Sequence, residues 1–105
     1  MSLSPTTGTL SIALSGIEAA EQRIGTASHN VANLLTDDFH PLRTTQSARA
    51  SGGVSTRTER SEDPAEVSLA HELVGAELAS VQARASLRVA DVELDLLGRL
   101  IDLHA

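Results

Sequence analysis

Apolar residues recur at alternating intervals of four and three along two stretches of the chain, and this spacing places them on one side of an α-helix. The first stretch predicts a helix over about 7–36. Every second position in its row holds a small residue except the last, and small residues let a neighbouring helix approach closely. The row consists of Ala13, Ile17, Ala20, Ile24, Ala27, Val31 and Leu34.

The second stretch is longer and predicts a helix over about 64–103. Asp63-Pro64-Ala65-Glu66 resembles a helix start, with an acceptor side chain at the N-cap, proline at the first helical position and glutamate two residues later. The row consists of Leu69, Leu73, Ala76, Ser80, Ala83, Leu87, Ala90, Leu94, Leu97 and Ile101.

Together these rows predict an all-α fold: a long antiparallel two-helix coiled-coil hairpin with a flexible polar connection. We expect one domain made of an N-terminal helix and exit segment (1–39), a polar linker (40–62) and a C-terminal helix (63–105). The residues expected to hold the seam of this hairpin are Ile17, Ile24, Val31, Leu73, Leu87, Leu94 and Leu97.

The C-terminal helix also carries a second apolar row, about 100° away from the first. One partner helix covers only a narrow strip, so a lone hairpin would leave this row in water. The row predicts self-assembly or a helical partner, and the alternative is a monomer whose middle segment folds back over part of it. The residues expected to meet neighbouring subunits are Val74, Leu78, Val81, Val92 and Leu96.

The middle segment, about 40–62, is rich in Ser, Thr and Arg and contains the Gly52-Gly53 pair. It has no helical periodicity and is long for a connection within a compact domain. We expect it to be mobile or to become ordered only in an assembly. A short strand near 54–58 is an alternative for part of it.

Composition supports a helical assembly more than a compact globule. The chain has 105 residues, of which 41% are hydrophobic but only 1% aromatic, with no cysteine and a net charge of −6. An acidic chain is a poor nucleic-acid binder. Residues 40–60 are locally basic, with four Arg against one Glu, which suits either an acidic partner or a solvated linker.

No motif indicates catalysis, a metal or a cofactor. His29, His40, His71 and His104 do not form a metal-ligand spacing, and neither a nucleophile elbow nor a phosphate loop is present. The residues therefore indicate a non-enzyme with no catalytic, cofactor-binding or metal site. The start of the chain lacks the features of a cleaved signal peptide, and no segment is apolar enough for membrane insertion.

Two parts of the chain resemble the flagellar rod and hook protein family of bacteria. Ser28-His29-Asn30-Val31-Ala32-Asn33 is similar to the family's Ser-Asn-Asn-(Ile/Leu)-Ala-Asn stretch. Thr36 and Phe39 match the ANxxTxGF pattern that follows it, with Asp38 at the position of the family glycine. Residues 67–74 and 97–103 resemble the family's VDLAxEMV and LGxLLDL segments. The motif residues are thus Asn30, Ala32, Asn33, Thr36 and Phe39.

This resemblance implies a structural subunit of the flagellar basal-body rod, which supports motility. It further implies helix–helix contacts with copies of the chain and with other rod or hook subunits. Export through the flagellar type III apparatus without a cleaved signal is also implied. From the residues themselves, Asn30 and Asn33 are expected to hydrogen-bond to a neighbouring helix or to the chain leaving the helix, and Phe39 to anchor that exit. The alternative function is a small cytosolic coiled-coil adaptor.

Overall fold

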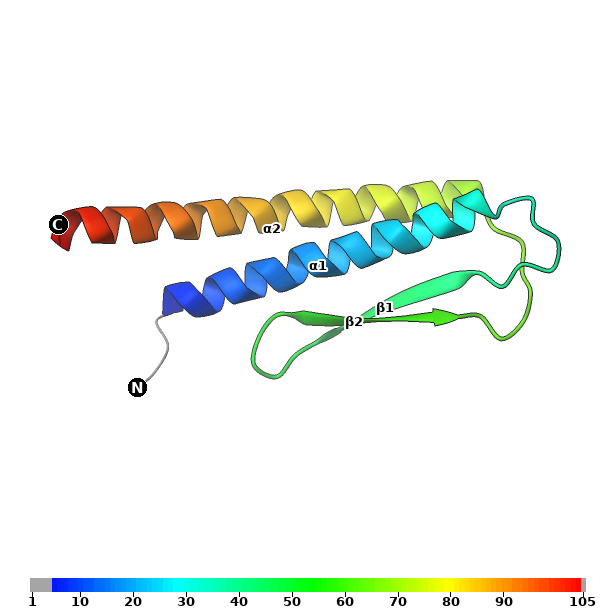
Figure 1. Ribbon diagram of the computed structural model, residues 1–105, viewed down its shortest axis with the longest axis horizontal. Helices are drawn as coiled ribbons and strands as arrows, with labels where there is room; N and C mark the ends of the chain where they lie inside the picture. Colours follow the sequence, from blue (N-terminus) through cyan, green and yellow to red (C-terminus); the bar gives the residue numbers. More distant parts are fainter. Residues whose placement is uncertain (1–4, 105) are drawn as a thin grey trace.

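The computed structural model contains two long helices joined by a β-hairpin (Figure 1). It describes the backbone of residues 5–104 and the side chains of residues 8–103. The elements are α1 (Pro5–Ala32), β1 (Leu42–Ala48), β2 (Val54–Arg60) and α2 (Leu69–His104). Most of the N-terminal stretch considered for a signal peptide, Met1–Ser4, lies outside the described residues.

The prediction of an all-α fold with a flexible connection is wrong. β1 and β2 form a two-stranded antiparallel sheet in which Leu42 pairs with Arg60 and Ala48 with Val54, so the fold is mixed α/β. The suggested strand near 54–58 lies within β2. The sequence pattern did not predict β1. The side chains of its inward face after Leu42 are polar or small, so apolar and polar residues do not alternate along the strand.

Glycines make the turn of this hairpin. Gly52 and Gly53 have φ angles of +98° and +84°, which L-residues with a side chain rarely adopt. The Arg49 N–H donates to the Gly53 carbonyl at 3.0 Å and closes the loop. A Cβ at Gly52 would lie 2.8 Å from Cδ1 of Ile12, so the turn also needs glycine to pack against α1.

The three parts of the fold form layers with α1 in the middle. α2 packs along one side of α1 and the hairpin along another, whereas α2 and the strands make no comparable contact (Figure 1). Side chains connect the hairpin to α1: the Val54 N–H donates to Oγ of the buried Ser15 at 3.1 Å, and the Thr26 and Thr44 hydroxyls lie 2.5 Å apart. The middle segment therefore covers α1, and it leaves the outer apolar row of α2 uncovered.

Both helix ends adjacent to the hairpin differ from the prediction. α1 ends at Ala32 because the next N–H groups turn back to carbonyls three residues earlier, as in Asn33 to Asn30 at 3.1 Å. α2 begins at Leu69, where Oγ of Ser68 accepts the His71 N–H at 3.2 Å. Asp63–Glu66 does not start the helix, because Ala65 uses its N–H to pair with the Phe39 carbonyl.

The seam between the helices is made of small residues. Ile17, Ile24 and Val31 are half-buried on α1, in agreement with the predicted row. On α2, however, Leu73, Leu87 and Leu94 are exposed, and Leu97 alone of the predicted seam leucines is half-buried. The buried hydrophobic residues in the described part of the chain are Ala13, Ala19, Ala20, Ala27, Ala79 and Ala90.

Close helix approach explains why α2 is rotated from its predicted orientation. A Cβ at Gly16 would collide with the Ser86 hydroxyl, so the two backbones leave no room for leucine between them. α2 instead turns a row of small and polar residues inward, and its large apolar side chains move to the flanks of the seam. The inward row is Glu72, Ala76, Ala79, Ala83, Ser86, Ala90, Glu93 and Leu97.

The resulting molecule is elongated and has a large surface. It measures 62 × 24 × 15 Å, with a radius of gyration of 17.9 Å, whereas a compact domain of this length has about 13 Å. Its accessible surface is 7570 Å², against about 5,600 Å² for a compact monomer of the same mass. The excess of about 2,000 Å² comes from its rod shape and from side chains that a compact fold would bury.

Candidate assembly surfaces

Two exposed apolar flanks follow α2. The leucine flank comprises Leu73, Leu87, Leu94 and Ile101, which are 55–68% exposed. The valine flank comprises the residues predicted to meet other subunits, Val74, Leu78, Val81, Val92 and Leu96, which are 43–59% exposed. Side chains of this size are usually buried, and rows of them in water are typical of interaction surfaces.

The two flanks lie on opposite sides of the seam with α1. In the sequence, Leu87 follows the inward residue Ser86 by one position, whereas Leu78 precedes the inward residue Ala79 by one position. One residue corresponds to about 100° around an α-helix, so these steps lead in opposite directions from the seam. Each flank is therefore open to a different neighbour.

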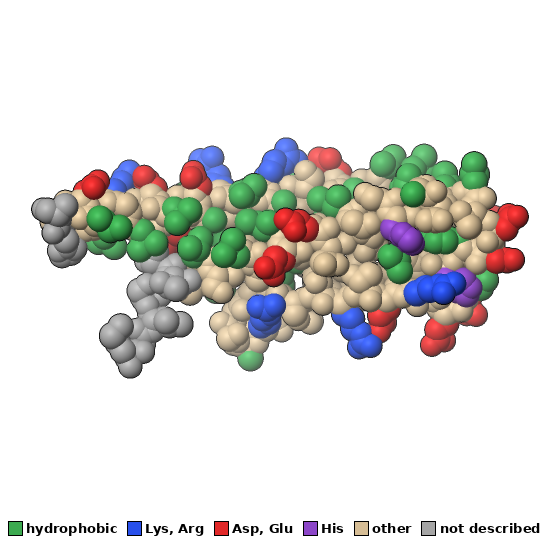
Figure 2. Space-filling model, viewed as in Figure 1, with side chains coloured by type: hydrophobic (Ala, Val, Ile, Leu, Met, Phe, Trp, Pro, Cys, Tyr) green, Lys and Arg blue, Asp and Glu red, His purple; other side chains and the backbone are tan. Residues whose placement is uncertain are grey.

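The face of α2 between the flanks, opposite the seam, is charged. It carries Glu77, Arg84, Asp95 and Arg99, and ion pairs join Arg84 to Glu77 at 3.5 Å and Arg99 to Asp95 at 3.2 Å. Figure 2 shows charged side chains along the edge of α2 that points away from α1, with hydrophobic side chains next to them. Burial of these charges would be unfavourable, so this charged ridge is less suited to packing than either flank.

The motif residue Asn30 joins three elements at one end of the molecule. It is 1% exposed and is the only side chain of its size that is fully buried among the described residues. Its amide accepts from the Leu42 N–H and donates to the Leu42 carbonyl, both at 2.9 Å, so it pairs with the start of β1 much as a strand would. It also donates to Oε1 of Glu72 on α2 at 3.2 Å. Asn30 thus bonds both to the other helix and to the chain that leaves its own helix.

The remaining motif residues shape the end of α1. Nδ2 of Asn33 donates to the His29 carbonyl at 2.9 Å, and the Thr36 hydroxyl donates to Oδ1 of Asn33 at 3.1 Å. Phe39 is half-buried and its ring lies 5.6 Å from that of His29 between centroids. Ala32 is exposed. These contacts hold the exit of α1 against its last turn.

Asp38 has a φ angle of +53°, the only positive value among the described non-glycine residues. Left-handed backbone is easiest for glycine, and aspartate tolerates it better than most residues. The position that differs from the family pattern therefore has the backbone conformation that favours the family's residue.

Sequence reasoning missed two residues that join the elements, Glu72 at the Asn30 junction and Ser15 beside the turn of the hairpin. Glu72 receives the third bond of Asn30, and Ser15 accepts the Val54 N–H while donating to the Ile12 carbonyl at 2.6 Å. Ser15 belongs to no motif, whereas Glu72 stands at the glutamate of the VDLAxEMV segment that residues 67–74 resemble. Glu72 does fall on the inward row of α2, but a glutamate there is a signal only once the helix orientation is known.

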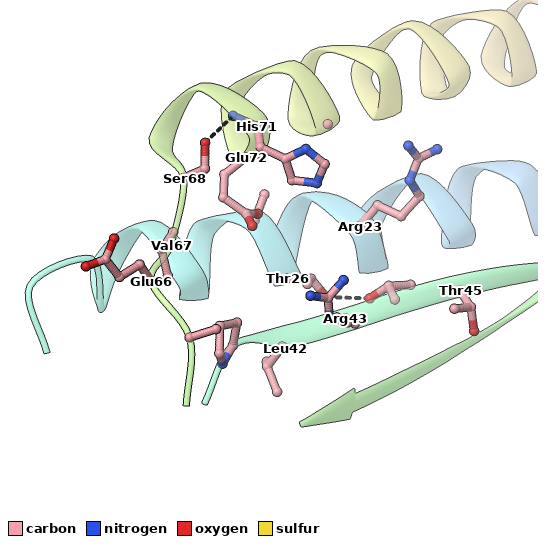
Figure 3. A pocket seen from close by; sticks show the side chains of 15 residues that line it. Arg23, Thr26, Leu42, Arg43, Thr45, Glu66, Val67, Ser68, His71 and Glu72 are labelled. Atoms are coloured by element: carbon pink, nitrogen blue, oxygen red, sulfur yellow. Dashed lines mark hydrogen bonds between the residues drawn. The ribbon is translucent and has the colours of Figure 1, made fainter. Parts of the chain in front are cut away.

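A polar cleft of about 350 Å³ lies where α1, β1 and the start of α2 meet (Figure 3). Arg23, Arg43, His71 and Glu72 line it from different elements. Arg23 is already engaged, since its Nη1 donates to Oε1 of Gln82 at 3.0 Å. The cleft thus combines charges of both signs with an arginine that already has a hydrogen-bond partner.

Among the side chains that the structure describes, residues 8–103, no three His, Asp or Glu lie close enough together to hold a metal ion. Neither helix, within the described ranges, combines the length and the apolar character required to cross a membrane.

Comparison with models of known protein families gives no match to the chain, and no curated protein is significantly similar to it in sequence.

Proposed function

We propose that this protein is a structural, non-enzymatic subunit of the bacterial flagellar basal-body rod, exported without a cleaved signal and assembled by helix–helix packing. Its partners would be copies of itself and other rod or hook subunits. The observation that carries the proposal is the pair of uncovered flanks on α2. Leu78 and Val81 are 57% and 51% exposed, and neither α1 nor the hairpin covers them. A chain that functions alone would be expected to bury more of this apolar surface.

The junction at the end of α1 supports the same proposal. The residues that resemble the family motif are those that fix the exit: Asn30 bonds to β1 and α2, Asn33 and Thr36 close the last turn, and Phe39 packs on His29. Asp38 adopts positive φ at the position of the family glycine. The motif thus coincides with a local structure that requires those residue types.

The rod shape also fits a subunit that packs side by side with others. Its thickness of 15–24 Å against a length of 62 Å gives long lateral faces and little room for an enclosed pocket. Two apolar flanks separated by a charged ridge suit a helix with a neighbour on each side and one face in water.

The test is the paired substitution Leu78→Asp and Val81→Asp in the organism that encodes the protein. We expect loss of the protein from purified basal bodies and loss of motility, because two buried charges at an interface are strongly unfavourable. Glu77→Ala on the charged ridge is the matched control and should retain both. If the double variant still co-purifies with basal bodies and the cells swim, the valine flank is not a rod interface. A cytosolic adaptor would instead be absent from basal bodies in the wild type.

A further inference from the structure

We propose that copies of the chain associate side by side through unlike surfaces, with the leucine flank of one copy packed into a hollow beside the valine flank of the next. This inference rests on the proposed self-assembly and adds which surfaces meet. The hollow has a volume of about 310 Å³ and lies between α1, α2 and the turn of the hairpin. Val54, Gln82 and Val89 contribute to its wall.

Small residues make much of the lining of this hollow. They are Ala13, Ser15, Gly16, Gly53, Ala85 and Ser86. Only glycine fits at positions 53 and 16, because the hairpin turn and α2 come so close to α1 there. The close contacts that leave no room for leucine in the seam therefore also leave a shallow apolar recess next to the seam, on the side of the valine flank.

The leucine flank has the complementary shape. Leu87 and Leu94 are each 55% exposed and stand seven residues apart on the same side of α2, so they project as two successive knobs. Large knobs that enter recesses lined by small residues reproduce the packing of coiled-coil helices. Two leucine flanks facing each other would instead bring knob against knob.

The amount of exposed surface agrees with two contacts per copy. A standard interface removes about 800 Å² from each partner, so one contact through each flank would remove about 1,600 Å² in total. The chain exposes about 2,000 Å² more than a compact monomer of its mass, in part because of its rod shape, so its surface has room for both contacts. Because the flanks lie on opposite sides of the seam, each contact leaves the other flank free, and such an interface propagates into a ring or a helical filament.

The absence of cysteine from the chain permits a direct test by disulfide cross-linking. Leu73→Cys, Leu87→Cys and Leu94→Cys, one at a time, are mixed with a differently tagged Ala85→Cys chain and oxidised with diamide. Ala85 lines the hollow, and each Leu-flank position is exposed, so these substitutions should leave the fold intact; circular dichroism checks this. We expect a dominant mixed cross-link for at least one of the three positions.

Arg88 lies four residues after Arg84 and therefore on the same charged face of α2. Arg88→Cys, mixed with Ala85→Cys, sets the background. Each Leu-flank variant alone should also stay at that background. A dominant cross-link between two identical Leu-flank variants would overturn the proposal, since it means that like flanks meet. Absence of any cross-link above background at concentrations up to about 1 mM would overturn it as well. Neither result depends on basal bodies, so the rod function and the contact between unlike surfaces can fail separately.

Discussion

The two helices of this protein differ in length, 28 residues for α1 against 36 for α2, and they bury very different parts of their apolar side chains. α1 has partners on two sides, and its large seam residues Ile17 and Ile24 are half-buried. α2 has one partner, and that contact is so close that mainly Ala, Ser and Gly fit within it. Within one chain, the packing of α1 is therefore more complete than that of α2, whose two flanks stay exposed.

This comparison also separates two uses of small residues. On α1, Gly16 and Ala20 allow α2 to approach, and this closeness fixes the orientation of the pair. On α2, the alanines of the seam give little hydrophobic stabilisation, since a methyl group buries far less area than leucine. We therefore expect monomer stability to depend on polar junctions more than is usual, and assembly to depend on the flanks.

The largest effect on stability is expected from Asn30→Ala on α1. It leaves the Leu42 N–H and carbonyl buried without a partner and removes a bond to Glu72. We expect a loss of about 2–3 kcal/mol in the free energy of unfolding, measured by urea denaturation. Asn33→Ala removes exposed bonds in the same turn and should cost no more than about 1 kcal/mol. Equal losses would show that the junction is not a centre of stability.

A second test uses two glycines of α1. Gly16→Ala places a Cβ against the Ser86 hydroxyl and should destabilise the chain by about 1–3 kcal/mol. Gly25→Ala meets nothing within 4 Å and should stabilise it by about 0.5–1 kcal/mol through helix propensity. Thermal unfolding measures both, and Ser86→Gly should rescue Gly16→Ala. Stabilisation by both alanines would contradict the close contact between the helices.

The smallest effect is expected on α2. Leu87→Ala in the dilute monomer should change the free energy of unfolding by about 0.5 kcal/mol or less, because Leu87 is 55% exposed. Ile24→Ala on α1 should cost about 1–2 kcal/mol, roughly half the value for a fully buried position. Urea denaturation below the concentration at which copies associate measures the pair. A larger loss at Leu87 would mean that α2 is rotated about its axis so that the leucine flank faces α1.

The sequence predicted the parts of the fold that depend on local spacing. The row from Ala13 to Val31 fixed the inward side of α1, because only one apolar face was available there. α2 offered two apolar rows, and the face that meets α1 is a third one, made of small and polar residues, that the apolar spacing does not mark. The choice depends on Gly16 and Ser86, which are 70 positions apart in the sequence. β1 was missed because a strand that packs through Thr44 and Gln46 carries no apolar alternation.

The candidate surfaces were predictable to a similar degree. Val74, Leu78 and Val81 were expected to be uncovered, and they are exposed. The leucine flank was not expected, because Leu73, Leu87 and Leu94 were placed in the seam. Asn30 was expected to bond to the exit or to a helix, but its pairing with both depends on tertiary structure that the motif does not describe.

The Asn30 junction also has a consequence for the order of folding. Its three hydrogen bonds join residues separated by 12 and 42 positions along the chain. A chain that has emerged only as far as residue 41 has no partner for this amide, and it also lacks the tertiary packing that supplies most of the stability of a helix in a protein. The junction closes only after residue 72 is present, so the start of the chain cannot reach its final state until most of the rest has arrived. A subunit that must stay unfolded during passage through a narrow channel would gain from such a delay.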